Sequence, residues 1–140
     1  MSRVFWDTNL FIYLFEGRGA QADRIVALRE RILERRDQLF TSALTLGEIL
    51  VKPVEADDTA LAGRYTRTIE ATAVVIPFSV EAAPIYARIR LDRSIRPPDA
   101  IQLACAAAAE IDLFVTNDDR LSRKSVPGIQ FITSLERAFL

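Results

Sequence analysis

Near its start the chain reads Arg3-Val4-Phe5-Trp6-Asp7-Thr8-Asn9, where a strand-like apolar run meets an acid, a hydroxyl and an amide. A second apolar run, at 10–15, follows at once and has helical character. Asp7 thus lies between two of the most hydrophobic segments of the sequence, where an ionised carboxylate is unfavourable unless another group compensates it. The rest of the chain must supply the partners of Asp7.

The length and composition limit the classes of protein to consider. With 140 residues, the chain has the size of one domain, residues 1–140, which can bury a core without disulfides or a structural metal. Its single cysteine, Cys105, excludes an internal disulfide and is expected in the core. The net charge of -1 provides no global field that attracts nucleic acid. The sequence has no histidine, which excludes imidazole bases and zinc sites with His ligands.

No segment reads as a targeting signal or a membrane span. Asp7 and Asn9 interrupt the N-terminal apolar run, and the Ala-rich run at 104–109 is far shorter than the ~20 residues that a span requires. We therefore expect a cytoplasmic protein without a membrane partner.

Strand-like and helix-like segments alternate along the whole chain. Strands are expected at 3–6, 39–42, 73–78 (a buried strand), 113–116 and 129–132. Helices are expected at 10–15, 20–37, 44–51 (ended by Pro53), 59–72, 80–91 and 97–110, with a short terminal helix capped by Ser134. The alternation predicts an α/β domain with one parallel sheet covered by helices on both faces.

Four acids stand at the ends of these elements, and each has an ordinary structural explanation. Asp7 would cap the helix that follows it, and Asp118 would cap the chain after its strand. The segment Thr45-Leu46-Gly47-Glu48 spells a capping box, in which the glutamate reaches back to the cap. Asp99 follows two prolines in the first turn of a helix, where the dipole favours an acid. Taken singly, none of the four requires a function.

Their shared placement supports a second interpretation. Open parallel sheets bind ligands beyond the carboxyl ends of their strands, where a central first strand would bring these acids together. Two unit charges about 4 Å apart repel by about 4 kcal/mol at an effective dielectric near 20, so the cluster must share protons or bind a cation. Oxygen ligands without His or Cys favour Mg²⁺ or Mn²⁺. Such a site suggests phosphodiester chemistry.

Four short motifs resemble those of the PIN domain family, and within it the small VapC-type toxin ribonucleases. They are Val4-Phe5-Trp6-Asp7-Thr8-Asn9, Thr45-Leu46-Gly47-Glu48-Ile49, Pro98-Asp99-Ala100-Ile101-Gln102-Leu103-Ala104 and Val115-Thr116-Asn117-Asp118. The resemblance implies a three-layer α/β/α sandwich whose central five-stranded parallel sheet has the order 3-2-1-4-5.

The resemblance also implies the residues of a site. The acidic metal ligands would be Asp7, Glu48, Asp99 and Asp118, with the first and third closest to the metal. Thr116 would take part by orienting ligands and water, and Asn9 is a weaker candidate for the same role. Of the basic residues near the motifs, Arg96 and Arg120 are the candidates for binding substrate phosphate. Asp119 receives no role.

The activity that the resemblance implies is a Mg²⁺- or Mn²⁺-dependent endoribonuclease, which uses a metal-activated water and leaves a 5′-phosphate and a 3′-hydroxyl. Family members of this size commonly form homodimers and are silenced by a small antitoxin that lies along a hydrophobic groove near the site. The expected helix at 20–37 is one candidate for that groove, although its apolar face also suits the core.

Three other classes stay open. A receiver-like signalling domain needs a lysine after its final core strand and an acceptor aspartate after a middle strand, whereas Ser79-Val80 follows Phe78 and Lys124 lies in an expected loop. A phosphatase with an aspartate nucleophile would carry an acid two positions after Asp7, where Asn9 stands. The third is a PIN-like regulatory binding module without turnover, against which the four acids argue.

Overall fold

The short strand β1 (Arg3–Trp6) is the centre of the sheet. In this computed structural model, which describes residues 1–138, all five strands are parallel and lie in the order β3-β2-β1-β4-β5. The other strands are β2 (Gln38–Ser42), β3 (Val74–Ile76), β4 (Leu113–Thr116) and β5 (Phe131–Ser134). The α/β fold and the expected strand order are thus confirmed. The order differs from the 2-1-3-4-5 of receiver domains, which argues against that alternative.

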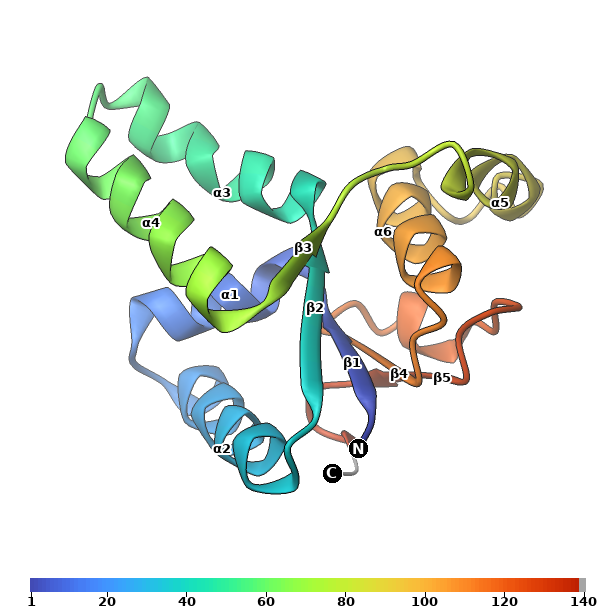
Figure 1. Cartoon of the computed structure of the whole chain (residues 1–140), viewed down its shortest axis with the longest axis horizontal. Coiled ribbons are helices and arrows are strands. Elements are labelled where there is room, and N and C mark those ends of the chain that lie inside the picture. The colour runs from blue at the N-terminus through green and yellow to red at the C-terminus, as the bar shows by residue number, and fades with distance from the viewer. Residues whose placement is uncertain (139–140) are drawn as a thin grey trace.

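Helices cover both faces of the sheet and complete the three layers (Figure 1). One side carries α1 (Thr8–Glu16), α2 (Ala20–Arg35), α3 (Ala43–Glu55) and α4 (Thr59–Thr72). The other carries α5 (Ala82–Ile89) and α6 (Pro97–Ala108), and the 3₁₀ turn η1 (Leu121–Arg123) lies between β4 and β5 in the chain. No helix in the described part of the chain is long and apolar enough to span a bilayer.

Both faces of β1 are buried because its side chains alternate between two cores. Phe5 faces α6 and stacks on Phe114 of β4, with ring centroids 4.9 Å apart. Val4 and Trp6 face the opposite core, where Trp6 packs against Phe11 of α1 at 5.2 Å. Asp7 directly follows this enclosed strand and therefore lies at the carboxyl end of the sheet.

Two expectations about α3 are wrong. Its N-cap is Ser42, whose Oγ accepts the backbone N–H of Thr45 at 3.4 Å, so Thr45 is a helical residue and does not form the expected capping box with Glu48. The helix also continues past Pro53, which is buried inside it. Pro53 has no N–H to donate, but the N–H groups of Ala56 and Asp58 bond the carbonyl oxygens of Lys52 and Pro53 and complete the last turn.

Apart from the end of α3, the bounds of the observed helices and strands lie within two residues of the expected ones, but two strands still differ from the expectation. The segment 73–78 forms only the short edge strand β3 rather than a buried strand, and its Val74 is 48% exposed. The last strand begins at Phe131 because Gly128, with φ +98°, belongs to the turn before it. Ser134 ends β5, and the residues that follow form a turn rather than the expected helix as far as the structure describes them.

Gly128→Ala tests the turn before β5. An added Cβ would lie 3.0 Å from the carbonyl oxygen of Ala107 in α6, and the positive φ opposes any side chain. We expect the free energy of unfolding to fall by about 1–3 kcal/mol. The control is Gly47→Ala inside α3, where a Cβ meets nothing within 4 Å; it should raise stability by up to about 1 kcal/mol. Urea unfolding measures both, and equal effects would contradict this interpretation.

Candidate active site

A polar pocket of about 310 Å³ lies where β1 and β4 end. The four acids singled out from the sequence all line it: Asp7, Glu48, Asp99 and Asp118. They come from four separate segments of the chain. The pairing of β1 with β4 brings together the segments that carry Asp7 and Asp118. Because Trp6 pairs with Val115 in the parallel register, the residues after them, Asp7 and Thr116, lie side by side.

Asp7 is the buried acid of the pocket, with 8% of its surface exposed. Its Oδ1 accepts the N–H of Thr8 at 2.8 Å, so it caps α1 as its ordinary explanation required. Its Oδ2 accepts the hydroxyl of Thr116 at 2.9 Å. Burial raises the pKa of Asp7 to about 6 against the lowering effect of these two hydrogen bonds, and the charges of Asp99 and Glu48 raise it further.

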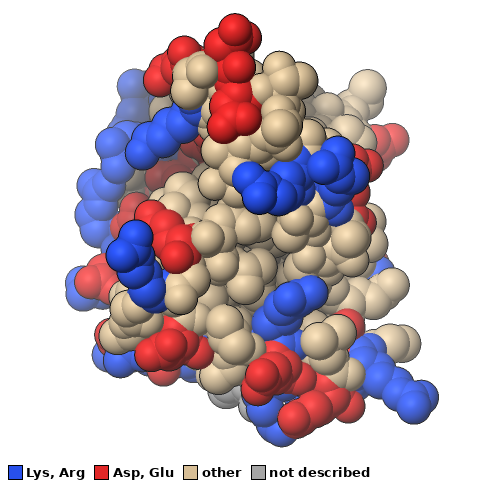
Figure 2. Space-filling model, turned by 90° about the vertical axis from the view of Figure 1, so that its left-hand side faces the viewer, with Lys and Arg blue, Asp and Glu red and all other residues tan. Residues whose placement is uncertain are grey.

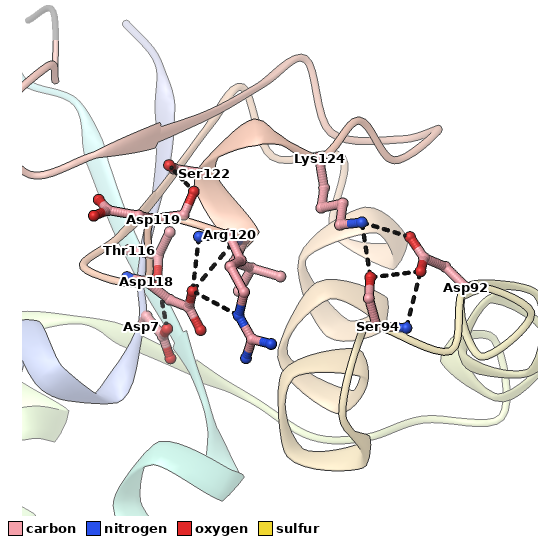
Figure 3. A network of polar contacts seen from close by, with 10 residues as sticks. Asp7, Asp92, Ser94, Thr116, Asp118, Asp119, Arg120, Ser122 and Lys124 are labelled. Atoms are coloured by element: carbon pink, nitrogen blue, oxygen red, sulfur yellow. Dashed lines mark hydrogen bonds and ion pairs between the residues drawn. The ribbon is translucent and has the colours of Figure 1, made fainter.

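Asp118 likewise combines a structural contact with a place in the pocket. Its backbone N–H donates to Thr116 Oγ1 at 3.1 Å, and its Oδ1 accepts the N–H groups of Arg120 at 2.9 Å and Leu121 at 3.3 Å (Figure 3). It therefore caps the turn into η1. Nε of Arg120 lies 4.0 Å from Asp118 Oδ1, which places a guanidinium at the edge of the acidic cluster.

Asp99 stands in the first turn of α6, as expected, and is partly buried. Burial raises its pKa, and the charge of Asp118 raises it further, whereas Arg96 lowers it. Arg96 is the exposed N-cap residue of α6 and also lines the pocket. Both arginines named from the sequence thus lie close enough to the acids to act on them.

Glu48 is exposed, and a hydroxyl holds it: its Oε1 accepts the hydroxyl of Thr8 at 2.7 Å. Beneath this contact lies Gln102 of α6, which is 2% exposed and donates to Thr8 Oγ1 and Thr45 Oγ1. The sequence interpretation assigned no site role to Gln102 or Thr45. The available signal was a single amide in the otherwise apolar run of α6 at 100–107.

The remaining candidates differ in their positions. Asn9 is exposed and lines the pocket. Asp119 is exposed and does not line it, and its carboxylate points away from Asp7 (Figure 3). Lys124 bonds Asp92 at 2.9 Å, on the far side of Figure 3 from the acids. The pocket therefore collects the four acids, Asn9 and one arginine, with Arg120 at its edge.

The donor set of the pocket fits a hard divalent cation, because it offers carboxylate oxygens without nitrogen or sulfur ligands. Within residues 1–138, no three acidic or cysteine side chains are gathered tightly enough to hold a metal ion as they stand. Mutual repulsion keeps carboxylates apart, and it contributes to the raised pKa values of Asp7 and Asp99. A bound cation would remove that repulsion and allow them to approach one another.

A second, largely apolar groove of about 420 Å³ adjoins the acidic pocket and shares Ile12 and Glu48 with it. It lies between α1, α3 and α4, and its wall includes Phe15 and Tyr65, stacked at 4.5 Å. On the side of the molecule that carries α3 and α4, acidic and basic side chains are interspersed around an uncharged area (Figure 2). The apolar face of α2, the groove candidate in the sequence, is instead packed in the core.

Comparisons with known proteins identify the family to which this fold belongs. The family model of the PIN domain matches residues 4–127, whereas no curated protein sequence matches the chain. A chain of VapBC2 from Rickettsia felis, solved with a DNA fragment from the promoter, superposes with a TM-score of 0.74 at 17% identity, covering 94% of this chain and 98% of that one.

Two further structures are similar over nearly their whole length. One is a toxin–antitoxin complex from Klebsiella pneumoniae, with a TM-score of 0.64 and 25% identity over 90% of this chain and 94% of that one. The other is DNA-bound VapBC from Salmonella typhimurium, with a TM-score of 0.67 and 22% identity over 96% and 99%. Since the family model spans most of the sequence and these structures share its fold, the chain belongs to the PIN domain family.

Proposed function

We propose that this PIN domain is a VapC-type toxin, an endoribonuclease that hydrolyses RNA phosphodiester bonds with Mg²⁺ or Mn²⁺. The observation that carries the proposal is the meeting of Asp7, Glu48, Asp99 and Asp118 in one pocket. VapBC and toxin–antitoxin complexes among the similar structures support the toxin assignment. Oxygen-rich acidic pockets that bind divalent cations are suited to phosphoryl chemistry.

Each residue of the pocket has a role in this proposal. When bound, the cation supplies positive charge to the phosphodiester and to the attacking water. Asp7 and Asp99 would hold it most directly, with Glu48 and Asp118 acting directly or through water. Thr116 orients Asp7 through its 2.9 Å hydrogen bond. The arginines at positions 96 and 120 would bind phosphate oxygens, and the products would carry a 5′-phosphate and a 3′-hydroxyl.

The partners follow from the same proposal. The apolar groove between α1, α3 and α4 would receive a segment of a small antitoxin, because it runs up to Glu48 at the mouth of the acidic pocket. A bound segment could thereby cover the site. The homodimer expected from the resemblance stays a prediction, as does a cytoplasmic location.

Asp7→Asn separates an enzyme from a PIN-like binding module without turnover. We expect the variant to lose RNA cleavage, because an amide is a poor cation ligand in this position. The matched control is Asp119→Asn, the same change at an exposed acid outside the pocket, which should cleave as the wild type does. The assay uses single-stranded and structured RNA with Mg²⁺, Mn²⁺ or EDTA. Wild-type cleavage by purified Asp7→Asn would refute the nuclease assignment.

The raised pKa of Asp7 predicts how stability depends on pH in the presence of EDTA. Between pH 3.8 and about 6 the unfolded carboxyl loses its proton while the folded one keeps it. Unfolding then releases a proton, so this group lowers stability as the pH rises through that window, by up to about 3 kcal/mol. Below pH 3.8 the contribution vanishes.

Asp7→Asn removes that contribution, together with the repulsion between Asp7 and the acids Asp99 and Glu48, and keeps all other titrating groups. Urea unfolding from pH 4 to pH 7 should give similar stabilities at the acid end and a more stable variant at neutral pH. Added Mg²⁺ should stabilise the wild type and so reduce the difference in free energy of unfolding between the two proteins. A difference between the two proteins that stays constant over this range would contradict the raised pKa.

Arg120→Ala tests the phosphate contact. Loss of one contact should weaken binding of single-stranded RNA and reduce the slope of log K against log salt concentration by about 0.7. The control is Arg35→Ala at the end of α2, where the arginine pairs with Asp37 just before β2, at the opposite edge of the sheet from the pocket. Fluorescence anisotropy at several salt concentrations, with the cleavage-deficient Asp7→Asn background, measures both. Equal slopes for the two variants would exclude Arg120 from the RNA contact.

A further inference from the structure

A buried amide is connected to the exposed glutamate of the pocket by hydrogen bonds. Gln102 Oε1 accepts the hydroxyl of Ser42 at 2.5 Å. Its Nε2 donates to Thr45 Oγ1 at 2.8 Å and to Thr8 Oγ1 at 3.2 Å. Thr8 in turn donates to Glu48 Oε1 at 2.7 Å. Every polar atom of the Gln102 side chain is therefore used beneath the pocket.

The direction of donation in this network follows from the number of protons. Because a carboxylate oxygen can only accept, Thr8 gives its single proton to Glu48. The 3.2 Å contact between the hydroxyls of Thr8 and Thr45 must then be donated by Thr45. Thr8 therefore accepts from Thr45 and from Gln102, and a flipped amide would leave its Oγ1 facing the oxygen of Gln102. The network thus has one orientation, which ends by donating to Glu48.

The network also joins the segments that carry the other acids. Thr8 directly follows Asp7, and Gln102 lies three residues after Asp99 on α6, where residues at this spacing share a helix face. Glu48 itself is exposed on α3, and an exposed glutamate without such a contact samples several rotamers. A fixed donor from Thr8 holds Oε1 and directs the carboxylate toward the pocket that Asp7 and Asp99 line.

We propose that Gln102 is a positioning residue, which acts through Thr8 to hold the Glu48 carboxylate where it can serve a divalent cation. The inference rests on the proposed metal-dependent function and adds a residue that lies below the acids. A purely structural role for the network would affect folding stability and leave the affinity for the cation unchanged. A direct measurement of cation affinity therefore distinguishes a positioning role of Gln102 from a purely structural one.

The experiment measures Mn²⁺ binding to the purified, folded chain by calorimetry, with thermal unfolding in parallel. Gln102→Met keeps the length of the side chain and removes its hydrogen bonds, and Thr8→Val removes the donor to Glu48 with little change in shape. We expect each to raise the Kd for Mn²⁺ by about 10-fold, the lower end of what loss of an outer partner of a metal ligand causes. The stability control is Asp58→Ala, which removes the cap of α4 and should lower Tm without changing the Kd.

A double variant tests whether Gln102 acts through the glutamate. In a Glu48→Gln background, adding Gln102→Met should cause no further loss of Mn²⁺ affinity, since the residue that it positions has gone. An unchanged Kd in folded Gln102→Met or in Thr8→Val, with a wild type that binds Mn²⁺, overturns the positioning role and leaves the proposed function standing. A wild type that does not bind Mn²⁺ overturns both.

Discussion

Asp7 directly follows the central strand, and its carboxyl group is buried. The contacts of its neighbours compensate for that burial. Backbone and hydroxyl donors from Thr8 and Thr116 satisfy its two oxygens, yet burial still raises its pKa to about 6. A buried, partly repelled acid lowers the stability of the domain at neutral pH. A cation would relieve this strain, which links the stability of the fold to the occupant that the pocket is suited to hold.

Three acids of the pocket have a structural role beside the metal-binding role proposed for them. Asp7 caps α1, Asp118 caps the turn into η1, and Asp99 occupies the first turn of α6. The capping hydrogen bonds of Asp7 and Asp118 also limit the rotation of their carboxyl groups. Glu48 differs, because the donor that holds it comes from another helix. Preorganisation of the site is therefore supplied partly by caps and partly by a buried polar network.

Much of the fold could be predicted from the sequence because most of its elements carry local signals. The apolar run of β1 and the charged residues along the outer face of α2 are examples. Two errors concern local geometry, because Pro53 is accommodated inside α3 and Ser42 rather than Thr45 caps that helix. Another arose from distant pairing, since β3 lies at the edge of the sheet and leaves the apolar Val74 exposed. The four acids were found from their places at element ends, whereas Gln102 was not, because its partners Ser42, Thr45 and Thr8 lie 57 to 94 residues away in the chain.

By itself, the sequence determined the alternation of strands and helices, the absence of histidine chemistry and the positions of Asp7, Asp99 and Asp118 at the ends of elements. Only the tertiary structure decided that these acids meet in one pocket, that Asp7 is buried enough to titrate near pH 6, and that a buried amide connects to Glu48. The physical reason is that local patterns depend on neighbouring side chains, whereas burial and long-range hydrogen bonds depend on which segments the parallel sheet and its helices bring together.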